Sequence, residues 1–193
     1  MKLEAFRSAL RTHPVMAILR GCGRDEAVEL AQRCWMAGLQ LVEVAQQRPE
    51  DGDVLQAVIE VAHGRPVGAG TILDATAARA ALERGATFVV SPGLDTEVVE
   101  VTRDAGALPV PGVLTPTEIM EARRAGVQAL KLFPAGPVGP SYLSAMMAPF
   151  PDLAFLAVGG VGSADIEPLM RAGAVGIGIG SELANLLSER EQQ

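Results

Sequence analysis

Two charged side chains stand within segments that otherwise resemble buried strands. Lys131 interrupts the apolar run "VQALKLF" at 127–133, and Glu43 interrupts "LQLVEVA" at 39–45. Burial disfavours the charged form of both groups, so the pKa of the lysine falls and that of the glutamate rises. A lysine amine that is neutral near pH 7 is a nucleophile suited to Schiff-base chemistry. A carboxyl group that titrates near neutral pH can accept and return the protons that this chemistry moves.

The same two residues admit a purely structural interpretation, a buried ion pair between Lys131 and Glu43. Such pairs are weak evidence of stability, because the desolvation of two charges can outweigh their attraction. Arg20 ends the first predicted strand, "VMAILR" at 15–20. If Arg20 lies close, it favours the reactive interpretation, because a neighbouring cation lowers the pKa of a lysine further.

The segments that carry these residues belong to a regular alternation of predicted strands and helices. Strands are expected at 15–20, 39–45, 66–71, 87–93, 107–112, 127–133, 153–160 and 174–180. Helices are expected at about 2–12, 25–38, 52–62, 75–85, 95–105, 115–126, 140–148, 163–173 and from about 181 onward. Strict β/α alternation predicts a parallel sheet.

Eight such units without a break suggest that the sheet closes on itself. We predict an α/β protein, a (β/α)8 TIM barrel with an N-terminal leader helix, as a single domain over 1–193. An open doubly wound sheet is the alternative. Alternate side chains of a barrel strand face its interior, which places Lys131 with Ala129, and Glu43 with Leu41, inside the barrel. Thr71 ends the third strand.

Glycine-rich segments end the last two predicted strands, "AVGGVG" at 157–162 and "GIGIGSEL" at 176–183. Many barrels bind phosphate at these two strand ends. Gly159 and Gly160 allow close backbone approach, and Gly180 and Ser181 can present amides to an anion at a helix start. Tight strand-to-helix turns are the alternative explanation. A dinucleotide fingerprint is excluded, because "GIGIGS" lies too near the C-terminus for the rest of that fold.

Composition narrows the class of partner. The net charge of −7 argues against a nucleic-acid or anionic-membrane surface. No apolar run reaches the roughly 18 residues of a membrane span, and the charged N-terminus lacks the apolar segment of a secretory signal. We therefore expect a cytoplasmic protein with a small-molecule substrate, no nucleic-acid partner and no membrane partner.

Metal and nucleophile patterns are weak in this chain. His13 and His63 are the only histidines and neither ends a strand, so neither a zinc site nor a Ser-His-Asp triad is expected. Carbon–carbon bond chemistry here would use an amine rather than a metal. Cys22 and Cys34 are not expected to form a disulfide in a reducing compartment. Cys22 follows the first strand, either near the mouth of a site or simply as a small loop residue.

Several motifs in the same order carry a resemblance to a known family. They are "VMAILRG", "AGLQLVEV", "VGAGTILDATAARAALERGATFVVSPGL", "PGVLTPTEIMEARRAGVQALKLFPA", "FLAVGGV" and "AGAVGIGIGSEL". Over nearly its whole length the chain resembles the class I aldolases that cleave 2-keto-3-deoxy-6-phosphogluconate, 2-keto-3-deoxy-6-phosphogalactonate and 4-hydroxy-2-oxoglutarate.

The resemblance implies a role for each matching position. Lys131 is then the Schiff-base lysine and Glu43 the general acid/base, in a cleavage that gives pyruvate and glyceraldehyde 3-phosphate. Thr71 lies near the pyruvate carboxylate, and Pro92 and Phe133 line the pocket. The phosphate-binding positions match Gly159, Gly160 and Ser181. The family assembles as a homotrimer and uses no metal and no other cofactor.

Departures from the family pattern fall after the glutamate, where "EVAQQRP" replaces the Glu-Val-Thr-Leu-Arg-Thr of many phosphogluconate-type members. Ala45 stands for the threonine and Gln47 for the arginine that holds the substrate carboxylate. Val158 replaces a threonine before the glycine pair, as in phosphogalactonate-type members. Arg20 is then a candidate for the carboxylate contact, with Arg48 as an alternative. These features lean slightly toward the galactonate epimer, although "SPGL" and "LFPA" resemble the gluconate type.

The same residues are compatible with two other functions. One is a phosphosugar isomerase or epimerase on the same barrel, with Lys131 acting only through its charge. The poorly placed histidines argue against it, because such enzymes often use histidines or a metal. The other is a degenerate barrel that binds a keto acid without turnover, suggested by "EVAQQRP". Retention of both Glu43 and Lys131 argues against that alternative.

Overall fold

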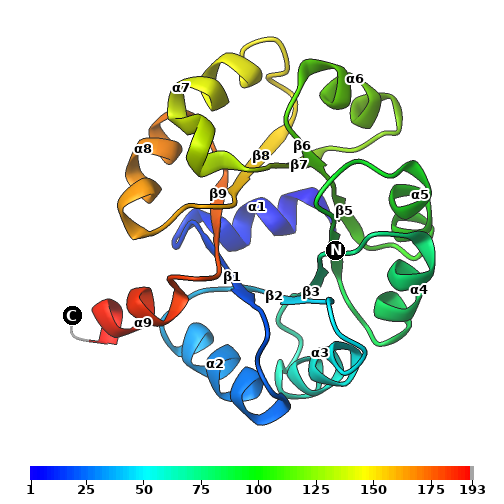
Figure 1. Ribbon diagram of the computed structural model, residues 1–193, viewed down its shortest axis with the longest axis vertical. Coiled ribbons are helices and arrows are strands. Elements are labelled where there is room, and N and C mark those ends of the chain that lie inside the picture. The colour runs from blue at the N-terminus through cyan, green and yellow to red at the C-terminus, as the bar shows by residue number, and fades with distance from the viewer. Residues whose placement is uncertain (192–193) are drawn as a thin grey trace.

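The computed structural model describes residues 1–191 as a ring of helices around one parallel sheet (Figure 1). Its strands are β1 Val15–Leu19, β2 Leu41–Ala45, β3 Val67–Gly70, β4 Phe88–Val90, β5 Leu108–Val110, β6 Gly112–Val113, β7 Ala129–Leu132, β8 Ala154–Val158 and β9 Gly176–Ile179. Its α-helices are α1 Leu3–Arg11, α2 Arg24–Met36, α3 Asp51–Val61, α4 Ala75–Glu83, α5 Thr96–Asp104, α6 Pro116–Arg124, α7 Ala135–Met147, α8 Ile166–Arg171 and α9 Leu183–Glu191.

The sheet runs in the order β5-β4-β3-β2-β1-β9-β8-β7-β6 and every pairing is parallel. Its two outer strands, β5 and β6, are joined along the chain by Pro111. The Pro111 carbonyl accepts a hydrogen bond of 2.9 Å from the Lys131 amide, so the same stretch of chain pairs with β4 on one side and with β7 on the other. The predicted (β/α)8 TIM-type barrel is therefore confirmed.

Three of the expected elements differ from those observed. The strand expected at 107–112 is divided, because Pro111 has no N–H to donate to a ladder. The helix expected around 140–148 begins at Ala135 and is interrupted at Gly139, whose φ of 75° is not helical. Pro140 then opens the second part, where a proline is well tolerated. The helix expected at 163–173 starts as a short 3-10 turn, Ser163–Asp165.

Side chains divide into an interior set and an outer set. The outer set, between sheet and helices, includes Val42, Val44, Leu130 and Leu132. The barrel interior is filled by Phe6, Leu10, Met16, Ile18, Leu41, Phe88, Val90, Leu108, Val110, Ala129, Ala154, Leu156 and Val158. Because side chains alternate along a strand, Glu43 and Lys131 point into the barrel with Leu41 and Ala129, as predicted.

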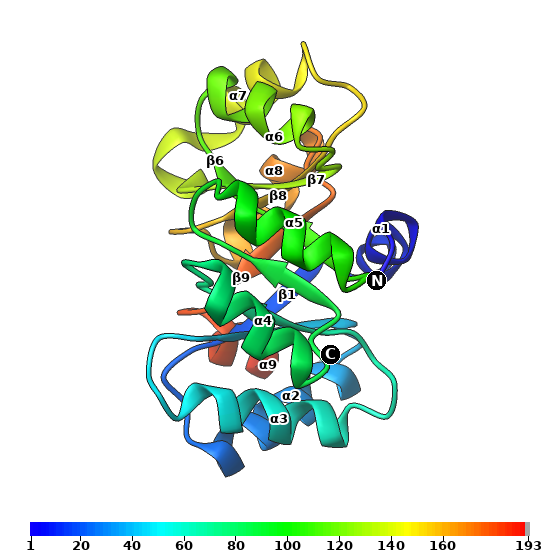
Figure 2. The same cartoon turned by 90° about the vertical axis from the view of Figure 1, so that its right-hand side faces the viewer.

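Helix α1 closes one end of the barrel. It lies across the centre of the ring in Figure 1 and projects from one end in Figure 2. Phe6 and Leu10 are buried, and the Phe6 ring meets Phe88 of β4 edge-on at a centroid distance of 6.0 Å. The predicted leader helix thus fills the amino-terminal end of the barrel and leaves the carboxyl ends of the strands for a site.

Candidate active site

Lys131 lies on β7 near the carboxyl end of the barrel, with only 5% of its surface exposed. Its backbone is fixed on both sides, because it pairs with Gly112 of β6 and with Leu156 of β8. Its Nζ lies 4.4 Å from the centroid of the Phe133 ring. The structure thus presents an amine at a defined point within an apolar surrounding.

Glu43 lies on β2 and is 2% exposed. Its carboxyl group fits against Gly70 of β3, where a Cβ atom would come within 1.7 Å of Glu43 Oε1. Any other residue at position 70 would displace the carboxyl group. Glu43 Oε2 is buried and has no hydrogen-bond partner. A buried carboxyl oxygen without a partner is costly, which is more typical of a group held ready for a reaction than of a structural contact.

Burial shifts the pKa of both groups toward neutrality. It raises the pKa of Glu43 to about 7, while the charges of Lys131 and Arg20 act in the opposite direction. It also lowers the pKa of Lys131, an effect that Glu43 opposes and Arg20 reinforces. Within residues 1–191, Glu43 and Lys131 form no ion pair. The geometry therefore favours two reactive groups over the buried ion pair considered as the alternative.

A cavity of about 480 Å³ opens at the carboxyl ends of the strands and brings most of the predicted site residues together. Lys131, Glu43 and Phe133 line its wall. The other predicted residues in the wall are Arg20, Gly159, Gly160, Gly180 and Ser181. One enclosure therefore holds an amine, a carboxyl group, a guanidinium and a glycine-rich edge.

The glycine-rich edge has the backbone form that close approach requires. Gly159 and Gly160 follow β8 with φ values of 93° and 66°, a conformation that favours glycine. A Cβ atom at Gly159 would lie 2.6 Å from the Phe133 ring, so this glycine also makes room for the aromatic wall. Gly180 and Ser181 lie in the turn between β9 and α9, separated from the first residue of α9 by Glu182, and the amino-terminal amides of a helix favour an anion.

Three predicted site residues lie outside the cavity wall, namely Gln47, Thr71 and Pro92. Gln47 nevertheless contacts the wall residue Arg20, because Gln47 Oε1 accepts a hydrogen bond of 3.3 Å from Arg20 Nη1. Thr71 comes directly after β3 with a φ of 58°, an uncommon conformation for a β-branched residue and one that clusters at functional sites. The Pro92 carbonyl packs against Gly112 of β6, where a Cβ would approach within 2.2 Å.

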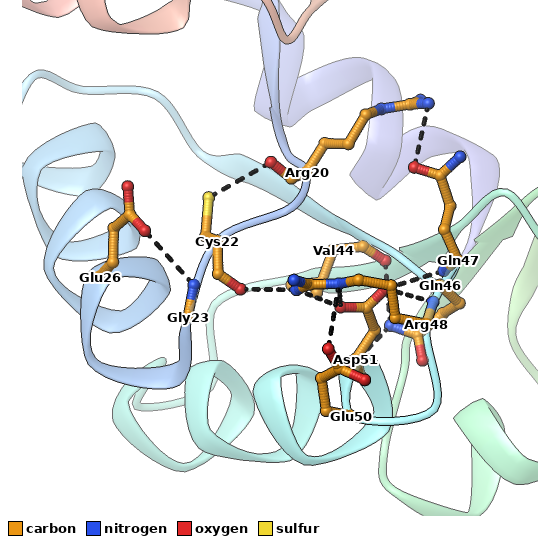
Figure 3. A network of polar contacts seen from close by, with 10 residues as sticks. All are labelled: Arg20, Cys22, Gly23, Glu26, Val44, Gln46, Gln47, Arg48, Glu50 and Asp51. Carbon is orange, nitrogen blue, oxygen red and sulfur yellow. Dashed lines mark hydrogen bonds and ion pairs between the residues drawn. The ribbon is translucent and has the colours of Figure 1, made fainter.

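Arg48 does not reach into the cavity, although the sequence left it as an alternative contact for the substrate carboxylate. Its Nη2 donates to Asp51 Oδ1 at 2.7 Å and to the Cys22 carbonyl at 2.9 Å (Figure 3). Arg20 is the guanidinium that lines the cavity. Of these two arginines, Arg20 is the one whose position borders the cavity.

Of the two positions that the sequence left open for Cys22, the structure shows the one beside a site. Cys22 lines the cavity, its Sγ donating to the Arg20 carbonyl at 3.5 Å, and burial raises its thiol pKa. Other wall residues were not revealed by the sequence. Leu30 of α2 and Leu183 and Ala184 of α9 also contribute. Apolar periodicity cannot distinguish a helix residue that packs on the sheet from one that borders a cavity.

No three His, Cys, Asp or Glu side chains within residues 1–191 gather closely enough to hold a metal ion. None of the helices in the same range has the length and apolar character that a membrane crossing requires.

The fold and the cavity define a TIM-type barrel enzyme with a buried amine and a buried carboxyl group at the carboxyl ends of its strands. Residues 6–192 match the family described as "Aldolase: KDPG and KHG aldolase". The chain belongs to this aldolase family, an aldehyde-lyase family, and the resemblance predicted from its motifs is confirmed.

Known relatives span most of the chain. Over 172 residues it is 36% identical to the 2-dehydro-3-deoxy-6-phosphogalactonate aldolase of Escherichia coli strain K12, covering 88% of this chain and 84% of the relative. It is also 36% identical over 164 residues to the 2-dehydro-3-deoxy-phosphogluconate aldolase of Pseudomonas aeruginosa, covering 83% and 72%. A solved structure described as native KDPGal is 31% identical, with a TM-score of 0.84 over 93% of this chain and 97% of that one.

Proposed function

We propose that the protein is a class I aldolase that cleaves a 2-keto-3-deoxy-6-phospho sugar acid reversibly to pyruvate and glyceraldehyde 3-phosphate. The observation that carries this proposal is the buried Lys131 in the same cavity as the buried Glu43. Because burial lowers the pKa of Lys131, more of its amine is neutral and able to attack a ketone. A glutamate with a pKa of about 7 can both accept and donate protons at neutral pH.

The reaction divides into steps that these two residues support. Neutral Lys131 attacks the C2 ketone, and loss of water gives a protonated imine. Glu43, directly or through a water, takes the proton of the C4 hydroxyl. The electrons of the C3–C4 bond then move into the imine, and glyceraldehyde 3-phosphate departs. Protonation of the remaining enamine at C3 and hydrolysis of the imine release pyruvate and return Lys131 to its free form.

The substrate would lie with its two anionic ends at opposite parts of the site. Arg20 and Thr71 would hold the carboxylate next to C2. Backbone amides at the glycine-rich edge would hold the phosphate, with Gly159, Gly160, Gly180 and Ser181 as the binding positions. These donors explain how a chain with a net charge of −7 can bind an anion. Phe133 and Pro92 would border the chain between the ends.

We further propose that the preferred substrate has the galactonate configuration at C4. Val158 lies in the cavity wall, where phosphogluconate-type members carry a threonine. Its apolar side chain cannot hydrogen-bond a substrate hydroxyl, whereas a threonine can. Gln47 bonds Arg20 rather than supplying a charge of its own. Both features match the phosphogalactonate type.

We further propose that the chain forms a single barrel domain and acts as a homotrimer in the cytoplasm without a metal or organic cofactor. The family resemblance supports the trimer, and light scattering of the purified protein tests it. The phosphorylated substrate supports the cytoplasmic location, because phosphorylated sugar acids are intracellular metabolites.

A cleavage assay tests the proposed function. The protein is incubated with each phosphorylated keto acid separately, and pyruvate release is followed through its reduction to lactate. We expect release from at least one substrate, faster for the galactonate epimer, and none from a Lys131→Ala variant. A protein that binds pyruvate but cleaves neither substrate would support the degenerate barrel. Conversion of a phosphosugar without cleavage would support the isomerase or epimerase.

A further inference from the structure

The loops that follow β1 and β2 are joined by a hydrogen-bonded network centred on Asp51 (Figure 3). Asp51 is the first residue of α3 and is only 3% exposed. One of its carboxylate oxygens, Oδ2, accepts the backbone amides of Gln47 and Arg48, each at 2.8 Å. The other, Oδ1, accepts Arg48 Nε at 3.0 Å and Nη2 at 2.7 Å. The loop after β2 is therefore closed onto the start of α3.

Arg48 extends this network to the neighbouring loop. Its Nη2 also donates to the carbonyl of Cys22, which follows β1, at 2.9 Å. The guanidinium lies between Cys22 and Asp51 in Figure 3. Burial alone would raise the pKa of Asp51, but the hydrogen bonds from Arg48 and from the two amides lower it. Asp51 thus remains ionised at neutral pH and can hold Arg48 in place.

Gln47 connects this network to Arg20 in the cavity wall. Its backbone amide is fixed by Asp51, while its side-chain Oε1 accepts the hydrogen bond of 3.3 Å from Arg20 Nη1. Figure 3 shows the two side chains meeting end to end above the rest of the network. Arg20 lines the cavity, and its charge influences the pKa values of both Lys131 and Glu43. A long, exposed arginine without such a partner would sample many conformations.

We propose that Asp51 and Arg48 are positioning residues that orient Arg20 through Gln47, and that they thereby set the affinity for the carboxylate of the 2-keto acid. This inference rests on the proposed function, in which Arg20 binds that carboxylate. The inference also explains Gln47. Its amide oxygen orients the Arg20 guanidinium, which follows β1, whereas an arginine at position 47 would supply a cation itself.

Pyruvate is the probe for the test, because it carries the carboxylate and needs no choice of epimer. The concentration that gives half-maximal borohydride trapping on Lys131 is measured for the wild type, Arg48→Met, Arg20→Met and the double variant. We expect Arg48→Met to raise this concentration about fivefold and Arg20→Met to raise it at least as much. The two effects should not add, because both arginines act through Gln47. In the Arg20→Met background, Arg48→Met should add less than about twofold.

Arg24→Met is the matched control. It also removes one positive charge, from an arginine whose exposed ion pair with Glu60, at 3.8 Å, links α2 and α3 away from the cavity. Its half-maximal concentration should equal that of the wild type. At saturating pyruvate, the amount of adduct on Lys131 in Arg48→Met should also match the wild type, because the loss is one of binding alone.

A second variant covers the case in which Arg48→Met does not fold. Gln47→Leu keeps the backbone amide that Asp51 accepts and removes only the acceptor for Arg20. It should show the same rise and the same dependence on Arg20. The inference is overturned, with the proposed function left intact, if the folded variants show an unchanged half-maximal concentration. It is also overturned if Arg48→Met raises that concentration as much in the Arg20→Met background as in the wild type. A wild type that forms no adduct refutes the proposed function and the inference together.

Discussion

Replacement of Glu43 by glutamine should remove a pH dependence from the stability of the folded protein. A carboxyl group whose pKa is raised on folding binds its proton more tightly in the folded state than in the unfolded state. Stability from this group is therefore present at low pH and is lost as the pH rises from the unfolded pKa toward the folded one. For Glu43 that window runs from 4.5 to about 7.

The size of the effect follows from the same shift. At about 1.4 kcal/mol for each pH unit, the full window corresponds to about 3 kcal/mol, of which about 2.5 kcal/mol falls between pH 5 and pH 8. Glutamine has nearly the shape of the protonated side chain and does not titrate. The wild type should thus lose about 2.5 kcal/mol more than Glu43→Gln over this range.

The assay is urea unfolding at a fixed protein concentration, since any oligomer makes stability depend on it. Free energies of unfolding are compared at pH 5 and pH 8 for both proteins, so that the titrating groups that do not interact with Glu43 cancel in the difference. Glu60→Gln is the matched control, because this exposed glutamate on α3 has no role in the cavity and should show no comparable difference. An identical pH dependence in the wild type and Glu43→Gln would refute the view that Glu43 is buried with a raised pKa.

Three further predictions concern other parts of the account. Gly70→Ala should lower kcat about 100-fold, because the new Cβ displaces the Glu43 carboxyl group, while pyruvate trapping on Lys131 persists. The control is Gly68→Ala, whose Cβ would meet Phe88 instead and should chiefly lower stability. Equal losses of kcat in the two variants would contradict the role of Gly70. The rate of cleavage should rise with pH through about 7 as Glu43 becomes a base, and a Glu43→Gln profile that keeps this limb would exclude that role. Phe6→Ala should reduce the free energy of unfolding, measured by urea titration, by about 3–5 kcal/mol, because it leaves a cavity at the end of the barrel. Ser8→Ala, at an exposed position of the same helix, should reduce it by less than about 0.5 kcal/mol.

Much of the fold follows from local sequence, because strand and helix periods and glycine stops are local signals. The sequence also placed Glu43 and Lys131 inside the barrel, since alternation along a strand determines which face a residue occupies. It did not predict the division at Pro111 or the helical turn before Gly139. In both cases the apolar pattern continues while a single residue changes the backbone.

The parts of the site that sequence reasoning missed depend on contacts between neighbouring strands and loops. Gly70 falls within the expected strand at 66–71, but its position in the sequence does not show that it leaves space for a side chain on β2. Arg48 was the alternative contact for the substrate carboxylate, yet Asp51 and the Cys22 carbonyl hold it. Neither contact has a sequence spacing that reveals it. Acidic Asp51 three residues after Arg48 was the one available signal.

Chemical trapping of an imine with pyruvate shows which amine of the protein reacts. The protein is incubated with pyruvate and borohydride, digested, and mapped by mass spectrometry. We predict a reduced pyruvate adduct on Lys131 and on no other lysine, and no adduct in Lys131→Ala. The absence of an adduct in the wild type, or an adduct at Lys2, the only other lysine of the chain, would contradict it.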